Sequence, residues 1–96
     1  MRNPPPGDVY EKKYTGETVL TANGVPIVDG LRVFTNNLDR GVIDMSRANY
    51  EWNGVENRYV LWFDVLVDTT YKGEPTSSRD LQSDDRVATR FEGKDA

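Results

Sequence analysis

The most regular hydrophobic pattern of the chain lies in residues 58–69, RYVLWFDVLVDT. Apolar side chains fill alternate positions there, namely Tyr59, Leu61, Phe63, Val65 and Val67. The positions between them are mixed, with Val60, Trp62, Asp64, Leu66 and Asp68. A repeat of two is typical of a β-strand that lays one face on a core. The pattern predicts a long central strand with its apolar face inward and its mixed face half-exposed.

Residues 31–46 predict a β-hairpin. Apolar and polar positions alternate in LRVFT, the polar stretch NNLDRG follows, and the β pattern resumes in GVIDMS. Strands bounded by Asn, Asp and Gly are typical hairpin partners. Gly41 is expected to supply a positive φ or a β-bulge where the second strand begins.

Weaker β signals flank this region. Residues 17–22 and 25–28 surround an Asn-Gly pair and predict a second hairpin, in which Pro26 limits the following strand to a short or edge strand. Residues 46–58 predict either a hairpin through NGVEN or a short helical turn at 46–50. Residues 69–85 are expected to form a polar loop, 86–92 a last short strand and 93–96 a frayed end.

The pattern as a whole predicts an all-β fold, a small, partly open antiparallel β-barrel of the SH3-like kind with about five strands. The chain has 96 residues, which suits one domain. Three consecutive prolines disfavour helix and sheet, so residues 1–13 are expected to be a flexible Pro-rich, disordered lead. The single domain is then expected to span residues 14–93.

Charge narrows the class of partner. The net charge is −4, and residues 51–96 hold 6 basic and 10 acidic side chains. Non-specific nucleic-acid binding and binding to anionic membranes both depend on clustered Lys and Arg, so this balance argues against a general DNA-coating protein or a membrane partner. There is no cysteine and no signal-peptide or membrane-spanning pattern, so we expect a cytoplasmic protein.

Candidate chemistry is sparse. The chain has no histidine and no cysteine, the two residue types that most often act as proton shuttles and nucleophiles. The stretches 68–73 and 36–41 end in glycine at a calcium-loop spacing, but Lys72 and Arg40 stand where an oxygen ligand is needed. We therefore expect no enzymatic activity, no cofactor and no metal site.

Polar hairpin residues and aromatic side chains are the candidates for partner binding. Exposed aromatic rings beside a polar hairpin can stack on a base or surround a cation. The candidate residues are Asn36, Asn37, Asp39, Arg40, Tyr50, Trp52 and Trp62. Two alternatives stay open: Trp52 and Trp62 form a cross-strand pair that closes the core, and Arg40 forms only a local ion pair with Asp39.

The order VDGLRVFTNNLDRGVID followed by YVLWFDVLVDT resembles the small barrels of the KOW and Tudor type. The resemblance covers residues 28–68 and rests on Gly30, Val33, Gly41 and Val42. It implies a small barrel that binds nucleic acid, ribosomal or polymerase partners, or methylated side chains. No binding residue of that family carries over to a position of this chain.

Three functions remain as hypotheses. A small binding or accessory module for a protein partner comes first, because the chain is acidic. Nucleic-acid binding comes second and requires Arg32, Arg40, Arg47 and Arg58 to gather on one side among the aromatic residues. An acidic mimic of nucleic acid, using carboxylates between residues 64 and 85, comes third. A homodimer through the edge strand beside Pro26 is an alternative to a monomer.

Overall fold

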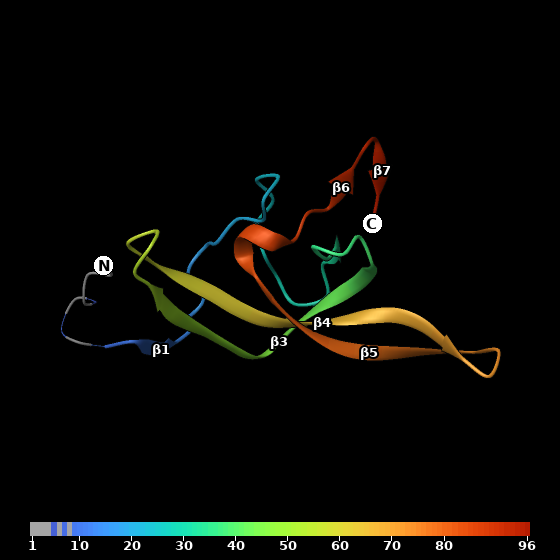
Figure 1. The fold of residues 1–96 in the computed structure, drawn as a ribbon, viewed down its shortest axis with the longest axis horizontal. Coiled ribbons are helices and arrows are strands. Elements are labelled where there is room, and N and C mark those ends of the chain that lie inside the picture. The colour runs from blue at the N-terminus through green and yellow to red at the C-terminus, as the bar shows by residue number, and fades with distance from the viewer. Residues whose placement is uncertain (1–4, 6, 8) are drawn as a thin grey trace.

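The structure is a computed structural model that describes residues 5, 7 and 9–96, and the prediction of a flexible lead falls partly on residues outside that set. The described residues form antiparallel sheets (Figure 1), so the expectation of an all-β chain is confirmed. The elements are β1 (Glu11–Lys13), β2 (Arg32–Phe34), β3 (Arg40–Asn53), β4 (Arg58–Tyr71), β5 (Glu74–Ser83), the 3₁₀ turn η2 (Asp84–Arg86), β6 (Arg90–Phe91) and β7 (Lys94–Asp95).

The main sheet is built around β3 and β4, which are 14 residues each. Strand β5 pairs with β4, while β1 and β2 pair with opposite ends of β3. The predicted strand–turn–strand at residues 33–44 is confirmed by the β2–β3 pairing, and the hairpin alternative for residues 46–58 is confirmed by β3 and β4. Strands β6 and β7 form a separate small sheet.

One face of the main sheet carries the core. Leu61, Phe63 and Val65 of β4 are at most 1% exposed, as the alternating pattern predicts. Figure 1 shows the segment 14–31, η2 and the β6–β7 hairpin on this side of the long strands. The core-forming residues from outside β4 are Ile27, Val33, Ile43, Tyr50 and Val87. The other face of β4 is less exposed than its mixed composition suggests, because Val60 and Asp64 are also buried.

Strand β3 contains a large bulge. Asp44 pairs with Asp64 and Asn49 pairs with Trp62, so the four residues 45–48 stand opposite Phe63 alone. Two carboxylates hold this irregular backbone: Asp29 accepts a hydrogen bond from the Met45 amide (2.8 Å) and Asp44 accepts one from the Ser46 amide (2.9 Å). Bulges bend a strand and redirect its side chains, and this one determines the shape of the sheet surface described below.

Gly41 has a different role from the one predicted. It is not among the residues with positive φ; the left-handed residue of the β2–β3 connection is Leu38 (φ 65°). A Cβ at Gly41 would lie 2.6 Å from the Leu66 carbonyl oxygen and 2.7 Å from Val65 Cγ1. Glycine is required there because β3 and β4 approach too closely for a side chain.

The prediction of a polar loop over residues 69–85 is wrong. Strand β4 continues to Tyr71, the chain turns through Lys72 (φ 52°) and Gly73 (φ 81°), and β5 follows at once. Positive φ at both turn residues is the geometry of a type I′ hairpin. Residues 74–80 are polar on both faces, so they give no amphipathic signal, and the Lys-Gly turn is less distinctive than Asn-Gly.

Three smaller expectations also need correction. Residues 17–28 do turn at Asn23-Gly24, but the two strands reduce to one bridge between Leu20 and Pro26. The strand predicted at 86–92 shortens to β6, and its partner β7 occupies the end that was expected to fray. Residues 11–13, placed in the flexible lead by the sequence, pair with β3 as β1.

Candidate functional site

We call the face of the main sheet opposite the core the outer face. The strand register places Trp62, Asp64 and Leu66 of β4 on it, with Leu81 and Arg79 beside them from β5. Leu81 is 60% exposed, and Trp62 and Leu66 are partly exposed. A single apolar side chain at a surface is ordinary, but neighbouring ones surrounded by charges are typical of interaction surfaces.

A charge network crosses the centre of the outer face. Asp44 and Asp64 stand directly opposite each other, an arrangement that would be repulsive without cations. Arg79 donates to both carboxylates, at 3.0 Å to Asp44 and 2.9 Å to Asp64. Arg47 adds two hydrogen bonds to Asp64, at 3.1 and 3.3 Å. Two arginines therefore balance two carboxylates.

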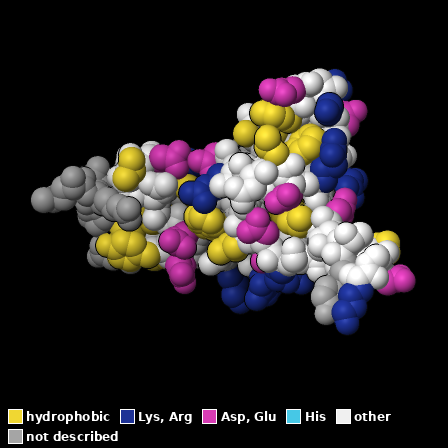
Figure 2. All heavy atoms as spheres, turned by 45° about the vertical axis from the view of Figure 1, so that its right-hand side comes forward, with side chains coloured by type: hydrophobic (Ala, Val, Ile, Leu, Met, Phe, Trp, Pro, Cys, Tyr) yellow, Lys and Arg dark blue, Asp and Glu magenta, His cyan; other side chains and the backbone are white. Residues whose placement is uncertain are grey.

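The network is layered from inside to outside. The Asp64 side chain is 3% exposed, whereas its partners Arg47 and Arg79 are 68% and 45% exposed. The carboxylate is thus covered by guanidinium groups that face the solvent. Figure 2 shows Lys and Arg side chains gathered along the lower surface of the molecule, on the side of the sheet away from the loops.

Hydrogen bonding shifts the ionisation of Asp44. Bonds from Ser46, together with Arg79, lower the pKa of Asp44 from 3.8 to about 2. Hydrogen bonds to Asp44 and Asp64 in turn raise the pKa of Arg79. Asp44 and Arg79 are therefore both charged at neutral pH.

The bulge of β3 borders a groove of about 700 Å³ on the outer face. Its lining combines the end of β1, the bulge and one residue of β5, and it contains no Asp or Glu: Lys13, Tyr14, Met45, Ser46, Arg47, Ala48, Asn49 and Leu81. A smaller hollow of about 150 Å³ lies further along the same strands, next to Trp62 and Val60. The Arg86 guanidinium lies 5.5 Å from the centre of a Trp62 ring.

The predicted hairpin residues Asn36, Asn37, Asp39 and Arg40 are all exposed. Thr35 organises the turn by accepting hydrogen bonds from the Asn37 and Asp39 amides, at 3.2 and 3.3 Å. Arg40 lies over the Phe34 ring (4.8 Å) and donates to the Asp95 carbonyl, so its contacts differ from the expected local pair with Asp39.

The predicted aromatic residues divide between two faces. Tyr50 is 8% exposed, and its hydroxyl donates to Glu17 (3.0 Å). Burial and Glu17 together raise the pKa of Tyr50 to about 12. Trp52 packs edge-on against Tyr59, with ring centres 5.1 Å apart. Tyr59 lies on the core face and Trp62 on the outer face.

The structure does not bring the predicted site together. Trp52 pairs with Tyr59 and Trp62 with Asn49, so the two tryptophans are not the cross-strand pair of the alternative interpretation. The hairpin tip adjoins the first residue of β3, Arg40, while Trp52 stands near its last. Only Trp62 of the predicted set belongs to the outer face beside the groove.

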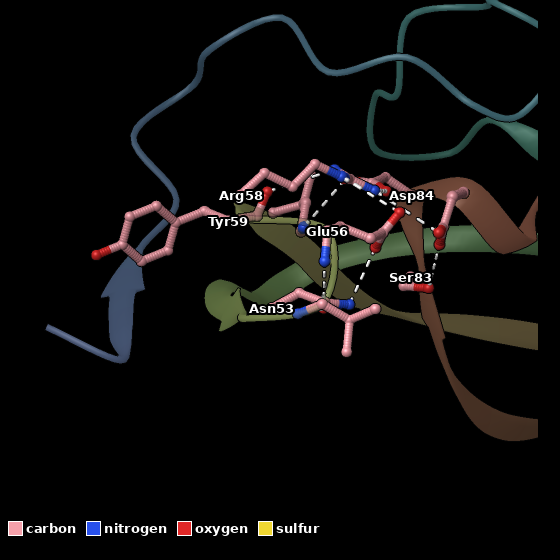
Figure 3. Close-up of polar contacts among 9 residues, drawn as sticks. Asn53, Glu56, Arg58, Tyr59, Ser83 and Asp84 are labelled. Carbon is pink, nitrogen blue, oxygen red and sulfur yellow. Dashed lines mark hydrogen bonds and ion pairs between the residues drawn. The ribbon is translucent and has the colours of Figure 1, made fainter. Parts of the chain in front are cut away.

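Arginines expected to cluster for nucleic acid are also dispersed. Strands β3 and β4 are antiparallel, so Arg40 and Arg58, which begin them, lie at opposite ends of the sheet. Arg58 forms a two-bond contact with the buried Asp84, at 3.0 and 3.1 Å (Figure 3), and this contact raises the pKa of Arg58. Arg32 pairs with Asp68, which leaves Arg47 as the member that borders the groove.

Several of the carboxylates proposed as a phosphate mimic bind other side chains of the chain itself. Asp64 and Asp84 are buried against arginines, and Asp84 also accepts a hydrogen bond from the Leu61 amide (3.1 Å). Within residues 5, 7 and 9–96, no three Asp or Glu side chains gather closely enough to hold a metal ion. None of the helical segments described has the length and apolar character required to cross a bilayer.

Sequence reasoning missed Lys13 and Leu81. Lys13 belongs to a segment expected to be a flexible lead, and Leu81 to a segment expected to be a loop. The signal that could have found Leu81 is its isolation, since it is the one apolar side chain between Pro75 and Val87.

Comparison with known proteins adds no relative, because no protein-family model, curated protein or solved structure matches this chain.

Proposed function

We propose that the protein is a non-enzymatic binding module that recognises another protein through the outer face of its main sheet. The observation that carries the proposal is the contrast between the two faces. The core face is covered by loops, η2 and β6–β7, whereas Trp62, Leu66 and Leu81 remain accessible on the outer face. Exposed apolar side chains interspersed with charged groups are common in protein interfaces.

The charge network supports a protein partner. Two arginines and two carboxylates already balance each other on the outer face, so the surface suits a partner of mixed composition. Such networks contribute to orientation and specificity in an interface more than to affinity. The partly open, SH3-like barrel belongs to the same proposal, and the bend at the bulge of β3 supports it.

A selection from a random peptide library displayed on phage tests the function. Selected peptides are then titrated into the nitrogen-15-labelled protein. We expect amide shifts concentrated on β3, β4 and β5 around Trp62, Leu66 and Leu81. The variant Leu81→Ser should weaken binding, whereas Val28→Ser, which removes a similarly exposed apolar group (55%) from the loop side, should leave it unchanged.

Two results would overturn the proposal. One is that no library peptide binds above the level seen with unfolded protein. The other is that the shifts map to the loop side or to the hairpin tip at residues 36–40. The same titration with a short oligonucleotide tests whether the outer face binds nucleic acid instead, which would give salt-sensitive shifts at Arg47, Arg79 and Arg86.

A further inference from the structure

We propose that the groove beside the β3 bulge binds a short acidic segment of the partner protein, with Lys13 and Arg47 recognising its carboxylates. This inference rests on the proposed function and names the chemistry of the partner. The groove lies on the outer face and is bordered by the end of β1, the residues 45–48 of the bulge, and Leu81 of β5.

The charge of the groove lining is the first argument. The whole chain has a net charge of −4, yet the groove lining includes two cations and no carboxylate. Arg47 is 68% exposed even though it covers Asp64. Among the described residues, no carboxylate forms an ion pair with Lys13. Lys13 is therefore a cation that can pair with a carboxylate of a bound partner, because no carboxylate of the described residues occupies it.

The surroundings of the groove limit the size of the anionic ligand. Glu11 and Glu51 pair across β1 and β3, only two residues from Lys13 and Asn49. A long polyanion that continued along the sheet in that direction would meet these two carboxylates. A ligand with a few negative charges avoids them, which favours an acidic peptide segment over a nucleic-acid strand.

The apolar part of the lining provides the second contact. Leu81 is 60% exposed, and Met45 and Ala48 border the same groove. A peptide can place apolar side chains against these groups while its carboxylates face Lys13 and Arg47. Single strands commonly gain affinity by stacking bases on aromatic rings, and the aromatic ring in this lining, Tyr14, already packs against Tyr50 at 5.9 Å.

The test uses three labelled probes and fluorescence anisotropy on the full chain. The first probe is a peptide of alternating Glu and Leu, the second replaces each Glu by Gln, and the third is a single-stranded oligothymidylate. Binding is measured at about 50 and about 300 mM salt, because screening weakens exposed charge pairs. We expect the Glu-Leu peptide to bind, the Gln-Leu peptide to bind more weakly, and the oligothymidylate not to bind.

Variants connect the binding to the groove. Lys13→Gln and Arg47→Gln should each raise the Kd of the Glu-Leu peptide by about fivefold. Lys94→Gln in β7 removes the same charge far from the groove and should leave the Kd unchanged. Lys13→Gln is the decisive variant because Lys13 has no ion pair in the described fold, whereas Arg47→Gln also removes a partner of Asp64.

Equal affinity for the Glu and Gln peptides, an unchanged Kd in Lys13→Gln, or preferential binding of the oligothymidylate would overturn the inference. The two proposals can fail separately. If library-selected peptides bind the outer face but the Glu-Leu peptide does not, only the acidic-segment inference fails. If neither kind of peptide binds, the proposed function fails with it.

Discussion

At the scale of single residues, carboxylates organise the irregular parts of this chain. Asp29 and Asp44 hold the bulge, and Asp84 accepts a bond from the Leu61 amide near the beginning of β4. Glu17 accepts bonds from Thr15 and Tyr50. Ionised carboxylates are strong acceptors for backbone and hydroxyl donors. An acidic composition is thus partly explained by local structure.

Acid should destabilise the fold through two of these groups. Hydrogen bonds lower the pKa of Asp44 from 3.8 to about 2, and those centred on Thr15 lower the pKa of Glu17 from 4.5 to about 2. Because both folded values are depressed, the stabilisation is complete above about pH 4.5 and is lost as the pH falls towards about 2. Urea unfolding followed across this range should show a falling free energy of unfolding.

The variants Asp44→Asn and Glu17→Gln separate the two contributions. Each should give a shallower loss of stability with acid than the parent protein, and the double variant the shallowest. The free energy of unfolding of each variant is also measured at pH 7, and its difference from the parent there is subtracted, which leaves the part that depends on pH. Curves that run parallel to the parent curve would exclude these two carboxylates as the source of the acid sensitivity.

At the scale of elements, the β4–β5 hairpin has two parts. From Trp62 to Val67, β4 lies between β3 and β5 in the sheet. Beyond Val67 the β4–β5 hairpin continues without β3 and projects at one end of the molecule (Figure 1). Residues 68–70 and 72–79 are exposed. This outer part has backbone hydrogen bonds but little apolar contact.

Amide hydrogen exchange should therefore change along one strand. We expect slow exchange at residues 61–65 of β4 and fast exchange at residues 69–74, because ribbons that bury little apolar area open locally at low cost. Exchange measured by NMR at several protein concentrations provides the control. If protection from exchange at residues 69–74 rises with protein concentration, this part of the β4–β5 hairpin pairs with a second copy of the chain.

At the scale of the whole molecule, stability depends on the one covered face of the sheet. Phe63 is 1% exposed and Leu81 is 60% exposed on neighbouring strands. Phe63→Ala should cost ~3–5 kcal/mol, a large share of the ~5–15 kcal/mol typical of a small domain. Leu81→Ala should change the free energy of unfolding by less than ~0.5 kcal/mol.

Urea titrations followed by tryptophan fluorescence and circular dichroism compare these two variants. A large loss in Leu81→Ala would mean that the outer face is part of the core, and the proposed binding surface would be wrong. A small loss in Phe63→Ala would contradict the assignment of the covered face. The Leu81 variants separate binding from stability, since a residue that binds a partner can be replaced without unfolding the chain.

The sequence by itself determined the elements with strong alternation or clear turn chemistry. The apolar face of β4 and the β2–β3 hairpin were predictable, because local periodicity and turn residues specify them. The hairpin through residues 54–57 was one of two alternatives that the sequence left open. The candidate hairpin tip was also correctly predicted to be exposed. Strand β5 was missed because a strand that is polar on both faces carries no periodic signal.

The tertiary structure alone decided which residues share a surface. Trp52 and Trp62 lie on different faces because the register of β3 and β4 pairs Trp52 with Tyr59 and Trp62 with Asn49. The bulge at residues 45–48 shifts the register only between Asp44 and Asn49. The groove brings together Lys13, Arg47 and Leu81, and each of these residues is 34 positions from the next in the sequence. Proximity of this kind depends on long-range strand pairing, which no local pattern of hydrophobic and polar residues contains.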